Sequence, residues 1–364
     1  MERGDIFVIY GTEIFENTLK LLEAAELAEM IGDRKRSVAV KPNLVTAKPA
    51  QSGATTHPEI VAGVLEYLRR EGFENVAVME GSWVGDRTDE AYRVSGIGAV
   101  CEKYGVPYYD LQRDSAREYD ARGMRLRICD RPMAADFIIN LPVLKGHCQT
   151  HVTCALKNMK GFLPDSEKRR FHALGLMKPI AHLNAVIRQD FILVDNICGD
   201  LDFEEGGNPV EMDRLLAFTD PVLCDAFACE AMGYALSEVP YIGMAEQLGV
   251  GSSDLARATV VELNHGSAAV ESAPSRRVAA LEEQIEARDA CSACYGALIH
   301  ALDRLGSSER EDRICIGQGW RDAEPTALAV RMGVGSCTKR CGYYCPGCPP
   351  TAASILKFLR EMES

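Results

Sequence analysis

The residues best suited to chemistry in this chain are the cysteines near its C-terminal end. Seven cysteines fall between Cys291 and Pro350, and the surrounding motifs read C-S-A-C from Cys291, G-S-C up to Cys337 and C-P-G-C-P-P from Cys345. Thiolates are the preferred ligands of iron–sulfur clusters and zinc, and four of them complete a tetrahedral set. The neighbouring glycines and prolines suit tight turns around an inorganic core. The stretch therefore predicts a 4Fe-4S site, with a zinc ribbon as the alternative.

A second group of reactive side chains lies between residues 145 and 188. This stretch holds eight lysines or arginines, two acids and four histidines, in a chain whose net charge is −13. Such a local excess of positive charge can receive a carboxylate or a phosphate. We expect Lys145 and Lys157 to neutralise an anionic ligand, and His147 or His172 to transfer a proton near neutral pH. The alternative is that these histidines are ordinary residues with satisfied hydrogen bonds.

Other charged segments have simpler interpretations. The sequence Lys168-Arg169-Arg170 is interpreted as a solvated face. An acidic, glycine-rich loop follows, with acids at 200, 202, 204 and 205. It is expected to pair with the basic stretch or, as a less favoured alternative, to hold a hard cation such as magnesium. Cys148 and Cys154 are interpreted as buried thiols.

The elements that must position these side chains are strands alternating with helices. The expected strands are 5–10, 37–41, 75–79, 106–110, 136–141 and 191–194. The expected helices are 13–30, 56–70, 89–104 and 221–232. This alternation predicts an α/β fold with a doubly wound, mainly parallel sheet.

Polar side chains stand where four of these strands end. They are Lys41 with Asn43, Glu80, Lys145 with His147, and Asp195. Ligands of such sheets bind outside the carboxyl ends of the strands, so these groups are expected to meet at one edge. A solvated strand terminus is the alternative for any one of them.

The C-terminal part predicts a small α/β unit around the cysteines. Its expected helices are 276–288, 294–305 and 351–363, and its expected strands are 313–316 and 328–332. The domain organisation follows: a main α/β domain over 1–265, a linker and helix over 266–288, and a cluster-binding unit over 289–364. The polar segment 267–275 is the expected junction.

Composition excludes several classes of protein. The negative net charge argues against general binding to nucleic acid or to a membrane surface, because both are anionic. No run of about 18 apolar residues predicts a membrane span, and the first residues carry no apolar signal region. The expected compartment is the cytoplasm, where fourteen cysteines are thiols or metal ligands. Neither a dinucleotide fingerprint nor a Walker loop is present.

Residues of about 36 to 235 resemble the domain-of-unknown-function 362 family, which is often associated with iron–sulfur domains. The resemblance rests on Lys41-Pro42-Asn43, Thr56-His57-Pro58, the block from Leu141 to His147, the block from Ala155 to Gly161, Lys168 with His172, Val194-Asp195, and Asp220-Pro221. In the domain that carries this resemblance, we expect catalytic roles for Lys145, His147, Lys157 and His172. We expect ligand contacts for Lys41, Asn43, His57, Glu80, Asn158 and Asp195.

The C-terminal motifs resemble the proximal-cluster site of the nickel–iron hydrogenase small subunit and its relative in respiratory complex I. Carried onto this sequence, the resemblance implies the cluster ligands Cys291, Cys294, Cys337 and Cys348. Cys341 and Cys345 are additional. A ferredoxin-like C-x-x-C from Cys345 would replace Cys337 with Cys345, and we favour Cys337 about two to one on spacing within the Cys₄ requirement.

Three functions are consistent with these residues. The first is a 4Fe-4S oxidoreductase or electron-transfer protein acting on a small anionic ligand at the strand ends. The second is a non-redox binding or transfer module in which the cluster is structural. The third is an electron-carrier or maturation partner of another protein, steered by its acidic surface.

Overall fold

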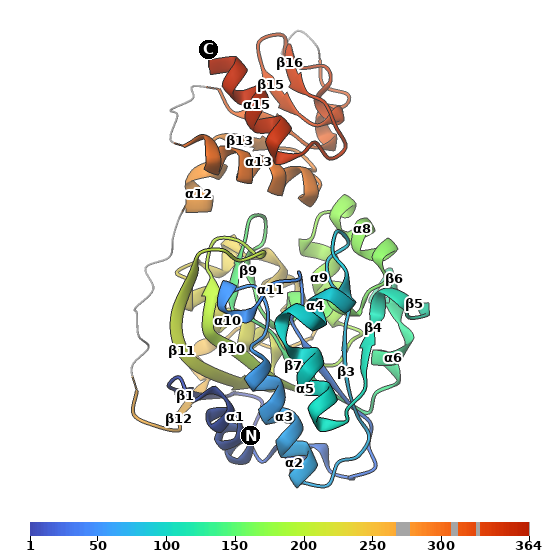
Figure 1. The fold of residues 1–364 in the computed structure, drawn as a ribbon. Helices are drawn as coiled ribbons and strands as arrows, with labels where there is room; N and C mark the ends of the chain where they lie inside the picture. Colours follow the sequence, from blue (N-terminus) through green and yellow to red (C-terminus); the bar gives the residue numbers. More distant parts are fainter. Residues whose placement is uncertain (267–276, 307–311, 325–327, 364) are drawn as a thin grey trace. The chain divides into compact units, whose positions relative to one another are not determined.

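The computed structural model describes residues 1–266, 277–306, 312–324 and 328–363, and the chain separates into two compact units. One unit comprises residues 1–168 and 177–274, and the other comprises residues 169–176 and 275–364 (Figure 1). The expected junction at 267–275 lies outside the described residues.

The first unit is built on an eight-stranded sheet. Its strands, in order across the sheet, are β12 (Thr259–Glu262), β1 (Asp5–Tyr10), β11 (Pro209–Phe218), β10 (Phe191–Asp200), β7 (Phe137–Leu141), β2 (Val38–Pro42), β3 (Val76–Glu80) and β4 (Tyr108–Asp110). Only β11 runs antiparallel to its two neighbours in this sheet, and every other pair is parallel. The prediction of an α/β fold with a mainly parallel sheet is confirmed.

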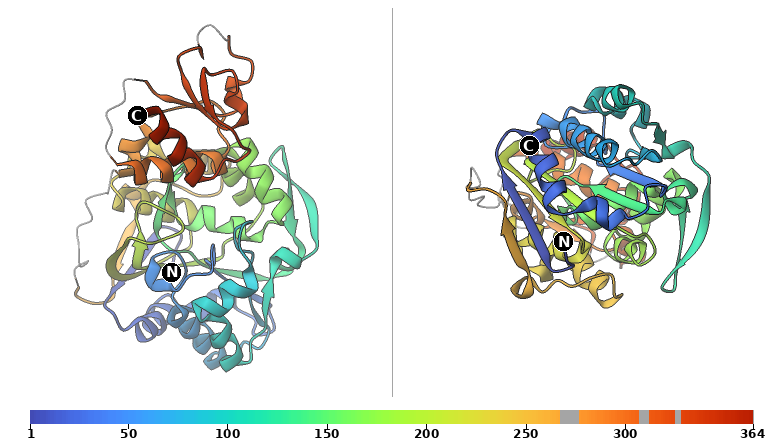
Figure 2. Two further views of the ribbon diagram at one scale, coloured as in Figure 1. Left: turned by 45° about the horizontal axis from the view of Figure 1, so that its top comes forward. Right: turned by 90° about the horizontal axis from the view of Figure 1, so that it is seen from below.

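Helices accompany the sheet along the chain. They are α1 (Ile14–Ala24), α2 (Leu27–Ile31), α3 (Pro58–Arg70), α4 (Thr88–Ser95), α5 (Ile97–Tyr104), α6 (Asp130–Ala134), α7 (Ala155–Asn158), α8 (Asp165–Leu174), α9 (Met177–Asn184), α10 (Pro221–Ala231) and α11 (Pro240–Gln247). Short 3-10 turns are η1 (Ala50–Ser52), η2 (Leu111–Arg113), η3 (Met159–Phe162), η4 (Leu236–Glu238) and η5 (Leu255–Arg257). Figure 2 shows the helices on both sides of the sheet.

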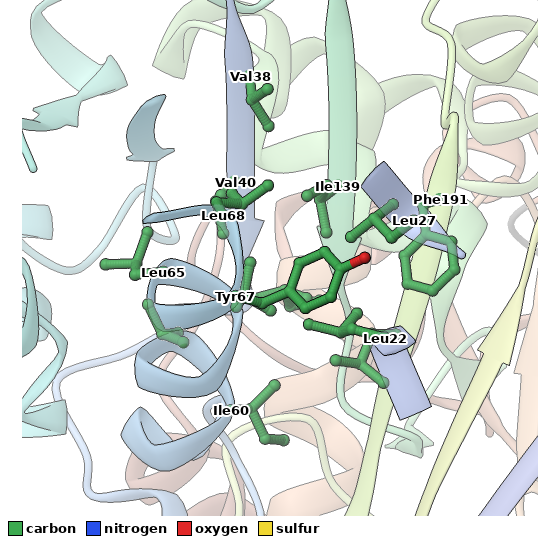
Figure 3. Close-up of a cluster of buried hydrophobic side chains, with 14 of the residues drawn as sticks. Leu22, Leu27, Val38, Val40, Ile60, Leu65, Tyr67, Leu68, Ile139 and Phe191 are labelled. Carbon is green, nitrogen blue, oxygen red and sulfur yellow. The ribbon is translucent and has the colours of Figure 1, made fainter. Parts of the chain in front are cut away.

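The main core lies between the sheet and the helices α1 to α5. Alternate residues of the central strands, such as Val38, Val40 and Ile139, point into it, because side chains of a strand alternate between faces. Figure 3 shows Tyr67 of α3 among these side chains, close to Leu22 of α1. The buried Tyr67 hydroxyl accepts a hydrogen bond from the Ala28 N–H at 3.1 Å, so the only polar group of this side chain is satisfied.

Two long predicted helices are interrupted, and both interruptions have a backbone cause. The segment 13–30 divides into α1 and α2 at Glu26, whose φ of 54° is left-handed. The segment 89–104 divides into α4 and α5 at Gly96, with a φ of 82°. Apolar periodicity continues across both breaks, so the pattern alone did not reveal them.

Several strands were missed or given wrong bounds. The strand predicted at 191–194 continues to Asp200 as β10, so Asp195 lies within the strand and not after it. The hairpin of β5 (Ala116–Ala121) and β6 (Met124–Cys129) and the short pair β8 (Lys145–His147) and β9 (His151–Thr153) were not predicted. Lys145 and His147 therefore stand on a small separate ribbon.

The second unit carries its own four-stranded parallel sheet. Its strands, in order, are β13 (Ile285–Ala287), β14 (Ile314–Ile316), β15 (Met332–Val334) and β16 (Tyr343–Cys345). Its helical elements are α12 (Arg277–Glu282), α13 (Ser292–Leu305), α15 (Ala352–Glu363), η6 (Gln318–Trp320) and η7 (Ser336–Thr338). The predicted strand at 328–332 is wrong, because the strand begins at Met332, and the predicted helix at 276–288 ends early and gives way to β13.

Replacing Leu22 with alanine should lower the free energy of unfolding by about 2–5 kcal/mol, because this fully buried side chain would leave a cavity in the main core. Urea unfolding followed by circular dichroism measures the change. The matched control is Lys20→Ala on the exposed side of the same helix, which should change stability by less than about 0.5 kcal/mol. Equal losses for both variants would contradict the assignment of this core.

Candidate functional site

The four cysteines inferred as cluster ligands all follow strands of the parallel C-terminal sheet. Cys291 is the N-cap residue of α13, shortly after β13, and Cys294 lies in the first turn of that helix. Cys337 lies in η7 directly after β15, and Cys348 comes shortly after β16. The carboxyl ends of parallel strands meet at one edge, which explains how residues distant in sequence approach each other.

The ionisation of these thiols reflects their proximity. Burial, followed by the charges of Cys291, Cys348 and Cys337, raises the pKa of Cys294 to about 12. Burial also raises the pKa of Cys291, and Cys337 and Cys348 add to the effect. Burial and the neighbouring thiols thus disfavour the charged forms of Cys291 and Cys294, which a bound cation would stabilise.

The remaining cysteines of this unit face elsewhere. Cys341 and Cys315 belong to a small buried apolar cluster with Trp320 and Leu328. Burial raises the pKa of Cys315 to about 12, with Cys341 as the next contributor. Cys345 is buried, and burial raises its pKa. A hydrogen bond with Ser354 opposes part of this increase. None of these three is among the groups that shift the pKa of Cys291 or Cys294.

Two side chains after β14 donate hydrogen bonds to sulfurs of the set. The Gln318 amide donates from Nε2 to Cys291 Sγ at 3.4 Å, and the Arg321 guanidinium donates from Nε to Cys337 Sγ at 3.4 Å. Every strand of the small sheet thus contributes a group to this edge. Neither donor was among the residues predicted for the cluster site, and no motif marked Arg321.

The turns that carry Cys337 and Cys348 are bonded to each other through the backbone. The Gly335 N–H donates to Cys345 O at 2.9 Å, and the Ser336 N–H donates to Gly347 O at 2.8 Å. Gly335 and Gly347 have φ values of 91° and 137°, which glycine adopts without strain. The glycines noted in the motifs therefore shape both turns.

In the first unit, Lys145 is completely buried and is bonded to oxygens from three segments. Its ammonium donates to Asn43 Oδ1 at 3.3 Å, to Ala54 O at 2.5 Å and to Glu204 O at 3.0 Å. Burial, the largest influence, lowers the pKa of Lys145 to about 8, against the opposing charge of Glu204. Since three acceptors occupy the ammonium, Lys145 holds these segments together.

Glu204 is the centre of the cationic group and was not among the predicted site residues. Its carboxylate forms an ion pair with Lys157 Nζ, and its Oε2 lies 3.3 Å from His147 Nε2. Burial alone would raise the pKa of Glu204, but Lys157 and His147 hold it well below its ordinary value. The signal for this residue was the acidic loop, whose predicted pairing with the basic stretch is confirmed here.

His147 is held as a neutral ring. Its Nδ1 accepts hydrogen bonds from the Gln149 and Thr150 N–H groups at 2.9 and 3.1 Å, so the proton of the neutral ring resides on Nε2 and faces Glu204. Burial, followed by the charge of Lys157, lowers the pKa of His147 to about 4. Burial and Lys157 likewise lower the pKa of Lys160 to about 7, so this amine can change charge near neutral pH.

A second buried cation, Lys41, lies at the end of β2. It forms an ion pair with Glu80 at the end of β3, and its Nζ lies 3.4 Å from Asn158 Oδ1. Asn158 in turn donates to Asn140 Oδ1 at 2.7 Å. Burial lowers the pKa of Lys41, against the effect of Glu80. Lys41, Glu80 and Asn158 are thus brought together.

The interpretation of Lys168 as part of a solvated face is wrong. Its ammonium is buried and donates to Gly81 O at 2.9 Å and to Ser82 O at 2.8 Å. The charge of Lys168 suggested solvent exposure. Its position on α8, however, places the side chain against the loop that follows β3. His172, four residues further along α8, belongs to the segment 169–176 that groups with the second unit.

His57 and Asp195 form a separate buried pair. His57 Nδ1 lies 2.9 Å from Asp195 Oδ2, and the His57 N–H donates to the same oxygen at 2.8 Å. Cys198 Sγ lies 4.0 Å from His57 Nε2. Cys198 was not singled out in the sequence.

One group in the described part of the chain has ligand atoms close enough together to hold a single metal ion, and the four C-terminal cysteines are not part of it. The ligand atoms of Cys154, Cys224 and Asp225 lie within 4.8 Å of one another, and all three residues are buried. The Asp225 carboxylate already accepts hydrogen bonds from the Leu156 N–H and the Tyr241 hydroxyl. Burial raises the pKa of Asp225 to about 7, so a protonated, structural carboxyl group accounts for this arrangement.

The neutral His147 gives a pH prediction. An unfolded histidine takes up a proton below about pH 6.5, whereas folded His147 does so only near 4, so the unfolded state binds more protons between these values. The stability contribution of His147 should therefore be complete above about pH 6.5 and fall by about 3 kcal/mol towards pH 4. Urea unfolding over this range should show a shallower decline for His147→Gln than for the wild type. Parallel curves would contradict the buried neutral ring.

Comparison with known proteins identifies the family of this chain. The thylakoid-associated protein sll1697 of Synechocystis sp. strain PCC 6803 is 26% identical over 233 residues, which are 60% of this chain and 69% of that protein. The lactate racemase apoprotein from Thermoanaerobacterium thermosaccharolyticum is similar with a TM-score of 0.43 and 15% identity, and the match covers 64% of this chain and 57% of that one. Within the described residues, no helix has the length and apolar character needed to cross a membrane. The family model for the domain of unknown function DUF362 matches residues 38–230, more than half of the 364 residues, and the chain belongs to this family.

Proposed function

We propose that this chain is an iron–sulfur protein whose C-terminal unit holds a 4Fe-4S cluster on Cys291, Cys294, Cys337 and Cys348. The observation that supports it is the mutual electrostatic influence of these four thiols, which follow parallel strands, whereas Cys341 packs with Cys315 and Cys345 bonds to Ser354. Four thiolates are the ligand set of this cluster. When bound, the cluster would transfer single electrons.

The residues around the four thiols would hold and tune such a group. Gln318 and Arg321 donate hydrogen bonds to ligand sulfurs, which stabilises thiolates relative to thiols and shifts a cluster's reduction potential. Gly335 and Gly347 keep side chains out of the two turns that carry Cys337 and Cys348. A zinc ion would use the same thiols, and the metal content of the protein distinguishes the two.

We propose that the first unit binds a small anionic ligand beside Lys157, His147 and Lys160. Glu204 supports this role, because a carboxylate already occupies the group and shows which chemistry it favours. Neutral His147 would donate a hydrogen bond from Nε2, and Lys160 would supply or remove a proton near pH 7. Lys145, Lys41, Asn43, Asn158 and Glu80 would position the segments around the ligand. Acting with the cluster, this site would make the protein an oxidoreductase or an electron-transfer protein.

We propose the cytoplasm as its compartment. All fourteen cysteines, each of them within the described residues, are free thiols, as expected where the surroundings are reducing.

Anaerobic purification followed by iron and acid-labile sulfide analysis and EPR tests the cluster. Cys337→Ser should lower bound iron by roughly half or more, because a Cys₄ site loses one ligand. Cys341→Ser is the matched control and should retain wild-type iron. Equal iron loss in both variants would refute the ligand assignment, and zinc in place of iron would refute the cluster. A cluster that is inert across biological potentials would instead assign it a structural role.

Binding of malonate and phosphate, followed by isothermal calorimetry, tests the anion site. Lys157→Met should weaken binding roughly tenfold or more, because a charge-assisted hydrogen bond is lost. Glu204→Gln should strengthen binding several-fold, because the competing carboxylate loses its charge. Lys178→Met, at an exposed position of α9, is the control and should bind like the wild type. If Lys157→Met and Lys178→Met bind both anions as the wild type does, the anion site is refuted.

A further inference from the structure

The strand β10 carries an irregularity beside the His57–Asp195 pair. Asp195 and Cys198 are three residues apart, so in a regular strand their side chains would point to opposite faces. The register of β10 against β11 shifts between Asn196 and Cys198, as in a β-bulge. As a result both side chains reach the His57 ring, Asp195 at Nδ1 and Cys198 at Nε2. Bulges commonly re-aim a side chain next to a functional site.

The orientation of His57 is determined by its surroundings. Its position at the N-cap of α3, directly before Pro58, directs its N–H to Asp195 Oδ2. The other carboxylate oxygen of Asp195 accepts a hydrogen bond from the Ile197 N–H at 3.2 Å. Each oxygen of this carboxylate is therefore fixed by a backbone N–H group. Asp195 thus receives the Nδ1 proton of His57, and Nε2 is directed at the sulfur.

The surroundings of His57 favour proton transfer from the thiol. Burial opposes a charge on His57, but Asp195, followed by Cys198, raises its pKa to about 10. A neutral ring with this high proton affinity can take the proton of the neighbouring thiol, and the imidazolium then stabilises the thiolate that forms. In the structure Cys198 Sγ also lies 3.5 Å from Ala50 O, a resting hydrogen bond that thiolate formation would break.

We propose that Cys198, His57 and Asp195 form a nucleophilic cysteine site that accepts an acyl group from a carboxylate-bearing thioester. Cys198 supplies the nucleophile, His57 the acid and base, and Asp195 the orientation, which is the logic of a catalytic triad. This activity goes beyond the proposed electron transfer. Its preference for a carboxylate rests on the proposed anion site, whereas the nucleophile does not.

The chemistry balances without an oxidant or a reductant. The Cys198 proton passes to His57 Nε2, and the thiolate attacks the carbonyl carbon of the thioester. The tetrahedral intermediate collapses, the bond from carbon to the leaving sulfur breaks, and His57 returns the proton to that sulfur. The acyl group remains on Cys198 as a new thioester, and water activated by His57 releases it as a carboxylic acid.

Backbone contacts connect this site to the anion site. A Cβ atom on Gly199, the residue after Cys198, would lie 2.1 Å from Leu144 O and 3.7 Å from Lys145 Cα. The backbone beside the nucleophile therefore lies directly against the ribbon that carries Lys145 and His147. A carboxylate on the acyl chain could take the place of Glu204 beside Lys157, which is the reason for the expected substrate class.

Reactivity of Cys198 in the full-length protein gives the first test. Iodoacetamide labelling followed by peptide mass spectrometry should modify Cys198, which is 6% exposed, faster than Cys129, which is fully buried and bonded to Leu111 O. His57→Gln should slow labelling of Cys198 at pH 7 at least tenfold, and Asp195→Asn several-fold. His182→Gln, whose ring contacts Ala121 O, is the matched control and should label as the wild type does. Unchanged labelling in His57→Gln would overturn the site.

Acyl transfer gives the second test. The probes are the N-acetylcysteamine thioesters of glutarate and of pentanoate, which differ by a terminal carboxylate. Mass spectrometry should find the glutaryl adduct on Cys198, formed at least fivefold faster than the pentanoyl adduct, and Lys157→Met should remove this difference. No adduct on Cys198 from either probe would overturn the proposal, and equal rates would overturn the carboxylate preference. Iron content and malonate binding are measured in parallel, so failure of the cluster or the anion site is recognised separately.

Discussion

The structure of the first unit depends on the burial of lysine ammonium groups at the ends of its strands. Lys41 and Lys145 are fully buried, and Lys157 and Lys168 are nearly so. Removing such a charge from water is costly unless oxygens replace the water, so each ammonium must be surrounded by acceptors. Those acceptors come from segments far apart in the chain, including Glu80 and Glu204. The lysines therefore hold together the strand ends and loops that make the site.

The same burial explains why amines of this site can gain or lose a proton near neutral pH. Lowered pKa values of Lys145 and Lys160, about 8 and about 7, bring amines that are ordinarily charged towards neutral pH. Glu204 partly opposes this effect through its negative charge. Titratable groups with strongly shifted pKa values and a common location are typical of functional sites. The burial of these charges lowers stability and leaves an internal ion-pair network in the site. An incoming anion has to enter this network to bind.

Both units use one architectural rule for different chemistry. In the first, amines and imidazoles gather near the carboxyl ends of parallel strands, and in the second, four thiols do so at the ends of β13, β15 and β16. The rule follows from parallel topology, because loops at these ends return to the same edge of the sheet. Irregular backbone then adjusts individual side chains, as the bulge of β10 does for Cys198.

The sequence by itself determined the α/β class, the family and most of the central strands, because apolar segments of the right length and period need no long-range information. It also singled out Lys41, Glu80, Lys145, His147 and Lys157, which are buried together with acceptors. Only the tertiary structure decided that Glu204 neutralises Lys157, that Lys168 is buried and that His172 groups with the other unit. It also decided that Cys198 lies beside His57. These outcomes depend on strand register, a bulge and loop closure, and a local sequence pattern does not encode distances between residues that far apart in the chain.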